Sequence, residues 1–297
     1  MLDPFDPEDG TTILAPAAPG VGNWVGAPRV RWDPHRERVL LVYRERRPRG
    51  GPPPDRGHRC VVAESRDGVT FDELWAVTKD ELGTASMERF DVLPAAPDRY
   101  LLYLSYEDPA DGRWRIDVVE ASSPAFDLSR RRAVLTAAGT RTAAVKDPYV
   151  VPAGPLLMFV STFLTDEGPA PTSLAVSLDG VAFRWLGETF GVGSGWDRYQ
   201  ARLCGIVRAG DAFVGFYDGS RGPEEDTEER LGVARSFDLR RWERLTVDEP
   251  WVVSPHASGS LRYLDVLPRG DEWWLYYEYA RADGSHELRL SRVRVRD

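Results

Sequence analysis

Short hydrophobic runs separated by polar turns follow one another along the whole chain, and they determine the expected fold. The stretches 38–44, 100–106 and 273–279 are apolar, β-branched or aromatic, a composition typical of strands. No stretch shows a convincing 3.6-residue periodicity, so few helices are expected. The pattern therefore predicts an all-β protein.

One kind of run recurs five times and gives the chain an internal repeat. It is apolar but carries one or two charges, and its copies begin at Gly26, Glu88, Lys146, Gln200 and Arg262. The spacing of roughly 54 to 62 residues is in the range typical of propellers. We therefore expect one five-bladed β-propeller domain over residues 1–297, with blades at about 24–80, 87–136, 144–190, 198–248 and 259–297.

The fifth repeat ends after three predicted strands. A short strand-like stretch near the N-terminus, 11–15, could supply the missing outer strand. Such pairing would close the ring and remove its free edges, which is how closed β architectures avoid edge-to-edge pairing. We therefore expect the ring to be closed by this N-terminal strand.

A second motif follows the third predicted strand of several repeats: a serine, an aspartate two residues later, and then an aromatic residue. Its clear copies are 65–71, 177–183 and 236–242. A short aspartate side chain can cap its own turn, and the aromatic residue can pack between neighbouring units. We interpret the motif as structural, and it supports the repeat.

Composition excludes several classes of function. With 42% hydrophobic and 29% charged residues the chain can bury a sizeable core, and its net charge of −9 argues against general nucleic-acid binding. No apolar run approaches the length of a membrane helix, and the acidic start lacks the features of a signal peptide. We expect a cytoplasmic protein without membrane or nucleic-acid partners, and the oligomeric state is left open.

The sequence shows no spacing of residues typical of a metal site. Cys60 and Cys204 are the only cysteines, and the four histidines are scattered. The acidic loop 223–229 is interpreted as a solvated loop. Neither a metal nor another cofactor is expected.

Charges inside the five recurring runs are the candidate chemistry. A charge in a buried strand is costly unless it is paired or hydrated, so strands that share this feature are expected to line one polar space. The central run is Lys146-Asp147-Pro148, which holds one of only two lysines in the chain. A ring of arginines together with this lysine would favour an anionic ligand such as a phosphate or a carboxylate.

The units resemble the blades of the five-bladed β-propeller glycosidases, the invertase, levansucrase and arabinanase superfamily with the mannoside phosphorylases as relatives. The resemblance covers about 24–297, and its most specific part is Lys146-Asp147-Pro148, which is similar to the Arg-Asp-Pro motif of the third blade. It implies glycosidic-bond chemistry, in which one carboxyl group acts as acid and a second as base or nucleophile. By this resemblance Asp147 is the carboxylate that orients the substrate.

Two of the three carboxylate positions of that superfamily are changed. Ala27 stands where the first blade has an aspartate, and Gln200 lies near the place of the fourth-blade glutamate. Neither side chain can serve as a base or a general acid. Glu88, Asp91 and Asp265 are the candidate substitutes for proton transfer, and strand alternation predicts that only one of Glu88 and Asp91 faces the axis.

The remaining candidates are expected to contact the ligand. They are Arg29, Arg89, Lys146, Arg202 and Arg262 as cations, Tyr199 and Gln200 as hydrogen-bonding groups, Trp24 as a stacking surface and His256 as an acid or base at the rim. Together with Asp147 they predict a carbohydrate-active enzyme of the glycoside hydrolase type, with an anionic or phosphate-linked substrate as one option. The alternative is a repurposed propeller, either a non-hydrolytic biosynthetic enzyme or a protein that binds a sugar or a sugar-like acid.

Overall fold

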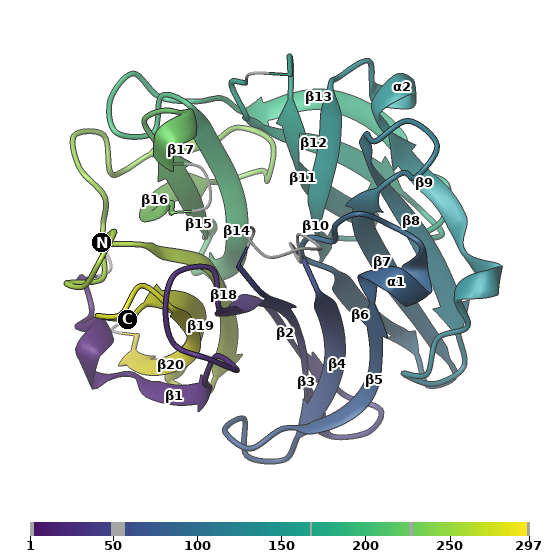
Figure 1. The fold of residues 1–297 in the computed structure, drawn as a ribbon, viewed down its shortest axis with the longest axis horizontal. Coiled ribbons are helices and arrows are strands. Elements are labelled where there is room, and N and C mark those ends of the chain that lie inside the picture. Colours follow the sequence, from purple (N-terminus) through teal and green to yellow (C-terminus); the bar gives the residue numbers. More distant parts are fainter. Residues whose placement is uncertain (1–2, 49–56, 167, 226–227, 296–297) are drawn as a thin grey trace.

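The computed structural model describes residues 3–48, 57–166, 168–225 and 228–295, and within them the chain is built mainly of strands (Figure 1). Its helical segments are all short: the helices α1 (Lys79–Leu82) and α2 (Ala137–Thr140), and the 3-10 turns η1 (Pro7–Asp9), η2 (Leu128–Arg130) and η3 (Pro223–Glu225). None of the helices in these ranges is long and apolar enough to cross a membrane. The all-β expectation is confirmed.

Three sheets contain four strands each, and the strands are antiparallel neighbours in chain order. The first is β6 (Asp91–Ala96), β7 (Arg99–Glu107), β8 (Trp114–Ala121) and β9 (Arg132–Thr136). The second is β10 (Ala144–Pro152), β11 (Leu156–Phe163), β12 (Thr172–Ser177) and β13 (Arg184–Phe190). The third is β14 (Gln200–Ala209), β15 (Ala212–Ser220), β16 (Arg230–Ser236) and β17 (Glu243–Arg244).

The fourth sheet combines strands from both ends of the chain. One half is β2 (Trp24–Asp33), β3 (Arg38–Arg46), β4 (Arg59–Ser65) and β5 (Asp72–Thr78), and the other is β18 (Leu261–Arg269), β19 (Glu272–Ala280) and β20 (His286–Arg294). A parallel pair, Trp24 with His286, joins the halves. The N-terminal strand β1 (Thr11–Leu14) pairs antiparallel with β20, as predicted. We call each four-stranded sheet, and each half of the fourth sheet, a unit.

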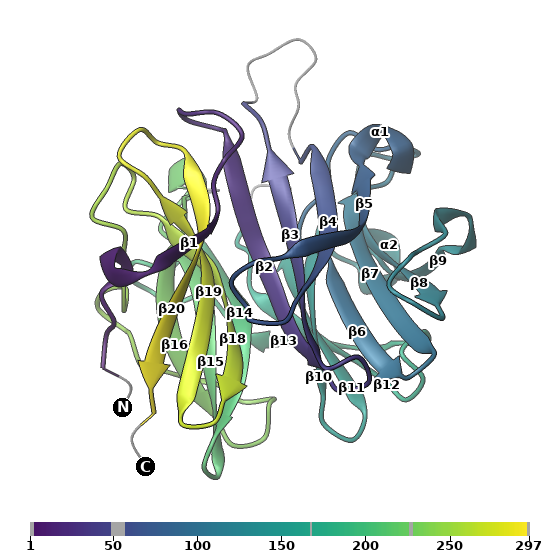
Figure 2. The same ribbon diagram turned by 90° about the horizontal axis from the view of Figure 1, so that it is seen from below.

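The first strand of each unit lies nearest a common centre, and the other strands follow outward (Figure 1). These inner strands are β2, β6, β10, β14 and β18, and they contact one another in the cyclic order β2, β6, β10, β14, β18 and back to β2. Figure 2 shows the sheets from the side, with both chain ends on the same flank of the molecule. Polar side chains of the inner strands are thereby brought together.

Inner strands carry a bulge at the charged run. The register with the second strand of the unit shifts within 26–29, 146–149 and 262–265. A bulge inserts an extra residue into a strand. Two residues that are three positions apart, one on each side of the bulge, therefore point to the same face, as residues two apart do in a regular strand.

The same spacing in the second unit overturns one prediction. Glu88 donates its backbone N–H to the carbonyl of Ser105, and Asp91 pairs with Tyr103. Three positions on this segment thus match two positions on β7, so the segment contains one extra residue here as well. Both carboxylates are buried and both contact neighbouring inner strands. The expectation that only one of them faces the axis is wrong, because it assumed an unbroken alternation of side chains.

In the fourth unit the charged run is displaced from the position that the sequence indicated. Arg202 pairs with Asp218 just before the bulge of β14, as Arg262 pairs with Glu278 just before the bulge of β18. Arg202, and not Gln200, therefore takes the position equivalent to Arg262. The run identified in the sequence begins at Gln200, two residues before this position.

The serine–aspartate turns have the structure predicted for them. In the first copy Ser65 Oγ donates to Asp67 Oδ1 at 2.8 Å, and this oxygen also accepts the backbone N–H groups two and three residues further on. The other two copies repeat these bonds. Their aromatic residues pack edge-on against the neighbouring unit, as Phe183 does against Tyr103. The motif thus joins units and takes no part in the centre.

Apolar faces of neighbouring units pack together to form the core. One cluster brings Leu101 and Val118 of the second unit against Val150 and Met158 of the third. Burial of such side chains contributes about 1.5–3 kcal/mol each. The core therefore lies between the sheets and leaves the centre to polar side chains.

Candidate functional site at the centre of the sheets

A chain of ion pairs crosses the centre at the level of the bulges. Arg202 of β14 makes three of them: Nη1 lies 2.9 Å from Asp147 Oδ2, and Nη2 lies 2.7 Å from Asp218 Oδ2 and 3.3 Å from Glu229 Oε1. All four side chains are buried. One guanidinium thus holds carboxylates from two neighbouring units.

Arg262 of β18 continues this chain. Its Nη1 lies 2.6 Å from Glu229 Oε2, and its Nη2 lies 2.7 Å from Glu278 Oε1 of β19. Glu278 Oε1 is also 2.8 Å from His286 Nδ1, and His286 Nε2 is 3.1 Å from Glu228 Oε2. Because charge-assisted bonds of this kind are short and directional, they fix the orientation of both partners.

Groups from the first, second and third units complete the cluster. Glu88 forms an ion pair with Arg44 of β3 and lies 3.9 Å from Lys146 Nζ. Lys146 Nζ also lies 5.4 Å from the ring centre of Trp114, within the range of a cation–π contact. We call these central charged groups the first layer: Arg44, Glu88, Lys146, Asp147, Arg202, Asp218, Glu229, Arg262 and Glu278.

Asp147 occupies an unusual backbone position within this layer. Its φ of 58° lies in the left-handed region, which is uncommon for residues other than glycine. Its Oδ1 accepts the backbone N–H of Arg89 at 3.2 Å and the hydroxyl of Tyr263 at 3.4 Å. Burial alone would raise its pKa, but Arg202, Lys146 and other nearby cations outweigh this and lower the pKa to about 2. Asp147 is therefore ionised and held on both oxygens.

The other carboxyl groups of the first layer differ in their ionisation. Burial opposes the ionisation of Glu229, but Arg262 and Arg202 lower its pKa to about 2. Arg262 likewise lowers the pKa of Glu278 well below its usual value, against the same effect of burial. Burial raises the pKa of Asp218, and the charge of Glu229 adds to this against the attraction of Arg202. Among Asp147, Asp218, Glu229 and Glu278, Asp218 is therefore the carboxyl group that is most easily protonated.

Asp91 and Asp265 lie one step further along the inner strands, in what we call the second layer. Arg29 bridges them, with 3.0 Å from Nε to Asp91 Oδ1 and 2.7 Å from Nη1 to Asp265 Oδ2. Asp91 also accepts the backbone N–H of Val150, and Asp265 accepts that of Val30, each at 2.6 Å. Both carboxylates tie inner strands together, which is the contact pattern of a structural role.

Ala27 and Gln200, the two positions at which the sequence resemblance would lead one to expect a carboxylate, lie at the same centre. Ala27 occupies the bulge of β2 with a φ of 51°, as Asp147 does in β10. Gln200 is buried at the start of β14, with Nε2 3.0 Å from Glu229 Oε1. Both positions therefore border first-layer groups, although neither contributes a charge.

Trp24 and Arg89 are also central, and both are enclosed by aromatic or charged neighbours. Trp24 is buried and stacks on His286, with ring centres 4.3 Å apart. Arg89 is fully buried, and its guanidinium carbon lies 5.3 Å and 5.4 Å from the ring centres of Tyr149 and Tyr263. Any ligand contact by either side chain would have to be made from within this packing.

His256 and Tyr199 lie in different surroundings. His256 Nε2 is 3.4 Å from Glu8 Oε1, and its ring lies edge-on to Tyr279, so it faces the N-terminal segment. Tyr199 is half-buried just before β14, where its backbone N–H bonds with the carbonyl of Ser220. The structure thus places His256 beside the N-terminal segment and Tyr199 at the entry to an inner strand.

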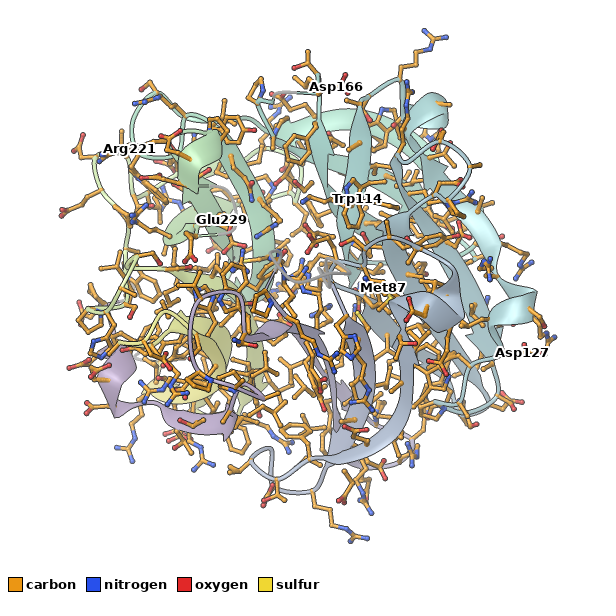
Figure 3. All side chains as sticks on the ribbon, in the orientation of Figure 1. Met87, Trp114, Asp127, Asp166, Arg221 and Glu229 are labelled. Carbon is orange, nitrogen blue, oxygen red and sulfur yellow. The ribbon has the colours of Figure 1, made fainter. Side chains whose placement is uncertain are left out.

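Four first-layer groups were not predicted from the sequence: Arg44, Asp218, Glu229 and Glu278. The interpretation of loop 223–229 as solvated is wrong for Glu229, which is buried and lies in the interior of the molecule (Figure 3). The other three lie in the second strands β3, β15 and β19. A charge inside an apolar strand, the signal that identified the inner runs, would have identified these residues too.

Two cavities that are lined by described residues do not reach Asp147. One, of about 300 Å³, lies at the second-layer end and is lined by Arg29, Trp32 and Tyr149 among others. The other, of about 320 Å³, lies beside the turn of Asp67. The charged side chains converge, and their closest described partners are one another.

The cysteines and potential metal ligands add no further centre. In the part of the chain that the structure describes, no three His, Cys, Asp or Glu side chains are grouped so as to hold a metal ion. Cys60 and Cys204 are both free and buried. Burial raises the pKa of each thiol, to about 12 for Cys60, so neither supplies a reactive thiolate at neutral pH.

His286 makes the stability of the cluster depend on pH. Burial opposes its protonation, but hydrogen bonds to Glu228 and Glu278 outweigh this and raise its pKa above the usual 6.5. A raised folded-state pKa adds stability below the unfolded value, and that stability is lost as the pH rises through the folded pKa. We expect the difference in unfolding free energy between wild type and His286→Gln to be largest below about pH 6.5 and to shrink as the pH rises above it. Urea denaturation measures it, and a difference that grows with pH would contradict this assignment.

Comparison with known proteins identifies the fold. No protein-family model and no curated protein matches the sequence. A thermostable family-43 glycoside hydrolase is similar in structure, with a TM-score of 0.69 at 13% identity over 96% of this chain and 93% of that chain. A glycosyl hydrolase from Bacteroides ovatus has a TM-score of 0.60 at 13% identity, over 97% of this chain and 90% of that chain. A GH43_1 enzyme from Xanthomonas citri complexed with xylotriose has a TM-score of 0.64 at 12% identity, over 95% of this chain and 89% of that chain.

At identities this low the likeness establishes the fold alone. It extends over almost the whole of this chain and of the solved structures, so no large part of the fold is unaccounted for. The chain shares the all-β fold of glycoside hydrolases of family 43, which agrees with the resemblance to the propeller glycosidases found in its sequence.

Proposed function

We propose that the protein is a carbohydrate-active enzyme that cleaves or transfers a glycosidic bond at the first layer. One observation carries the proposal: the chain Asp147–Arg202–Glu229–Arg262–Glu278, in which two arginines fix three buried carboxylates. Carboxylates placed around one centre are what glycosidic-bond chemistry requires, because its transition state carries positive charge on the sugar ring. The fold, which is shared with glycoside hydrolases, supports the same reading.

We propose further that the five units form one domain, a closed five-bladed propeller. The cyclic order of contacts among the inner strands supports closure, and so does the pairing of β1 with β20. The halves of the fourth sheet are joined by one parallel pair, between β2 and β20, which fits two neighbouring blades better than one continuous blade.

The substrate proposed is a sugar whose leaving group departs as an anion, such as a sugar phosphate. Asp147, Glu229 and Glu278 are ion-paired and ionised, so none of them is a ready proton donor. Asp218 is fully buried and bonded to Arg202, away from any described surface. A phosphate needs no such donor, because it is stable as an anion when the bond breaks.

A cytoplasmic setting fits this proposal. Cys60 and Cys204 are both free, as is usual for proteins kept in a reducing compartment. A phosphate-linked sugar is also the form in which sugars are held inside cells, because the charge prevents their escape through the membrane.

Turnover of a glycoside panel tests the proposed function. Wild type should hydrolyse at least one 4-nitrophenyl glycoside or glycosyl 1-phosphate, assayed with and without added phosphate to detect phosphorolysis. Asp147→Asn should lower kcat/KM by about 10- to 100-fold, the effect of losing a hydrogen bond to a charged group. Asp117→Asn is the matched control, because Asp117 is a buried carboxylate paired with Arg115 in β8, outside the first layer. If wild type turned over no member of the panel, the proposal would be contradicted.

Binding without turnover is the second candidate, and the residues at two positions favour it. By the sequence resemblance, Ala27 and Gln200 stand at two carboxylate positions of the glycosidase pattern, and neither side chain can transfer a proton. A binding protein would be stabilised by its sugar or sugar acid, by about 2.7 kcal/mol at 100 times Kd, with no product formed. A thermal-shift screen of the same panel separates the two candidates.

A further inference from the structure

A carboxylate lies beside Ala27, although Ala27 itself has none. Glu278 Oε2 accepts the backbone N–H of Ala27 at 3.0 Å. The neighbouring Gly26 leaves room for it, because a Cβ added there would lie 2.3 Å from Glu278 Oε2. Glu278 comes from β19 of the last unit, and it reaches across to β2 of the first. A carboxylate from the neighbouring unit thus lies at the bulge of the inner strand of the first unit.

A carboxylate also lies beside Gln200. Glu229 Oε1 accepts a hydrogen bond from Gln200 Nε2 at 3.0 Å. Glu229 lies just before β16, in the same unit as Gln200. Glu229 is buried although it belongs to an acidic loop, and it contacts both Arg202 and Arg262. A glutamate from the loop therefore stands where the inner strand lacks one.

These two glutamates are held together with Asp147. Arg202 connects Asp147 to Glu229, and Arg262 connects Glu229 to Glu278. Three carboxylates and two arginines alternate, so each carboxylate has a fixed neighbour of opposite charge. Nothing comparable joins Asp147 to the second layer in the described contacts.

We infer that Glu278 and Glu229, which lie beside Ala27 and Gln200, act together with Asp147 as the catalytic carboxylates of the proposed reaction. This inference rests on the proposed function, because it names the residues that would perform the reaction. In it Glu278 is the base, and Glu229 and Asp147 face the sugar and stabilise the positive charge that develops on its ring. His286 is a positioning residue for Glu278.

The proposed step needs no protein acid. The oxygen of water, or of an acceptor hydroxyl, forms a bond to the anomeric carbon while its proton passes to Glu278. The bond from the anomeric carbon to the leaving oxygen breaks, and the electron pair stays with that oxygen, which leaves as a phosphate or nitrophenolate anion. Glu278 then gives its proton to solvent and returns to the carboxylate form.

The neighbours of Glu278 show where this group is connected to solvent. His286 lies between Glu278 and Glu228, and Glu228 keeps 24% of its side chain exposed. Glu228, His286 and Glu278 thus form a hydrogen-bonded path from the surface at Glu228 to the buried centre at Glu278. Trp24 stacks on His286 and fixes its ring plane.

Glu278→Gln and Glu229→Gln test the inference, with Asp117→Asn as the control. We expect kcat on the best 4-nitrophenyl glycoside to fall by about 10²–10⁴-fold in Glu278→Gln and Glu229→Gln, and to stay within about two-fold of wild type in Asp117→Asn. In Glu278→Ala, sodium formate should restore part of the activity, because a small carboxylate can occupy the space and accept the proton. A merely structural role for Glu278 would give no such rescue, and urea denaturation of each variant verifies that it is folded.

A second readout does not depend on turnover. The iminosugar analogue of the same sugar is cationic, so it should bind to wild type and to Asp117→Asn but at least 10-fold more weakly to Glu278→Gln and Glu229→Gln. If wild type is active and both glutamine variants match it in kcat and in iminosugar affinity, the inference is overturned while the proposed function stands. If wild type neither turns over the panel nor binds any iminosugar, the proposed function fails and the inference falls with it.

Discussion

Replacement of Arg202 by methionine should lower the free energy of unfolding by about 3–5 kcal/mol. Arg202 is buried and pairs with three carboxyl groups, those of Asp147, Asp218 and Glu229. Methionine fills a similar volume but leaves these carboxylates without their main partner, and the energetic cost of buried charges that have lost a partner accounts for most of the loss. Urea denaturation at pH 7 measures the effect.

Arg235→Met is the matched control for this change. Arg235 forms an ion pair of 2.6 Å with Glu243 in the same unit, but both side chains are exposed, at 44% and 60%. Exposed pairs contribute little, so the control should stay within about 0.5 kcal/mol of wild type. Equal losses in the two variants would show that the first layer is not the electrostatic centre of the fold.

The second large effect is expected in the choice of leaving group. Wild type should act on a methyl glycoside about 10²–10⁴-fold more slowly than on the 4-nitrophenyl glycoside or 1-phosphate of the same sugar, because a methoxide leaving group needs a general acid and an ionised carboxylate cannot supply the proton. Asp147 and Glu229, whose pKa values are both lowered to about 2, would be almost wholly ionised at neutral pH. Initial rates on the matched glycosides, measured at pH 7, give the ratio.

A ratio close to one would contradict this part of the account. It would mean that a protonated group reaches the leaving oxygen, and Asp218, whose pKa is raised, would be the first residue to test. Asp218→Asn should then abolish the reaction of the methyl glycoside while the nitrophenyl reaction continues.

Much of the fold could be predicted because its signals are local. Strand propensity, the serine–aspartate turns and the short strand expected near 11–15 each depend on a few adjacent residues, and each was confirmed, the strand as Thr11–Leu14. The bulges of the inner strands were not predicted, since an extra residue leaves no mark in composition. That omission produced the wrong expectation for Glu88 and Asp91, because a bulge reverses the parity on which the expectation was based.

The site could be predicted only where its residues belong to inner strands. Asp147 and Arg202 were identified because a charge in an apolar inner run is conspicuous. Glu229 and Glu278 come from a loop and from a second strand, and contacts across units bring them to the centre. Sequence spacing within one repeat carries no information on such contacts, so only the three-dimensional structure could place these glutamates beside Gln200 and Ala27.

A crystal structure of the Glu278→Gln variant soaked with the glycoside that wild type turns over fastest is the most direct test of the central claim. The account predicts density for the sugar at the first layer, with its anomeric carbon between Asp147, Glu229 and the side chain at position 278. Density only in the cavity lined by Arg29, Trp32 and Tyr149, at the second-layer end, would contradict it.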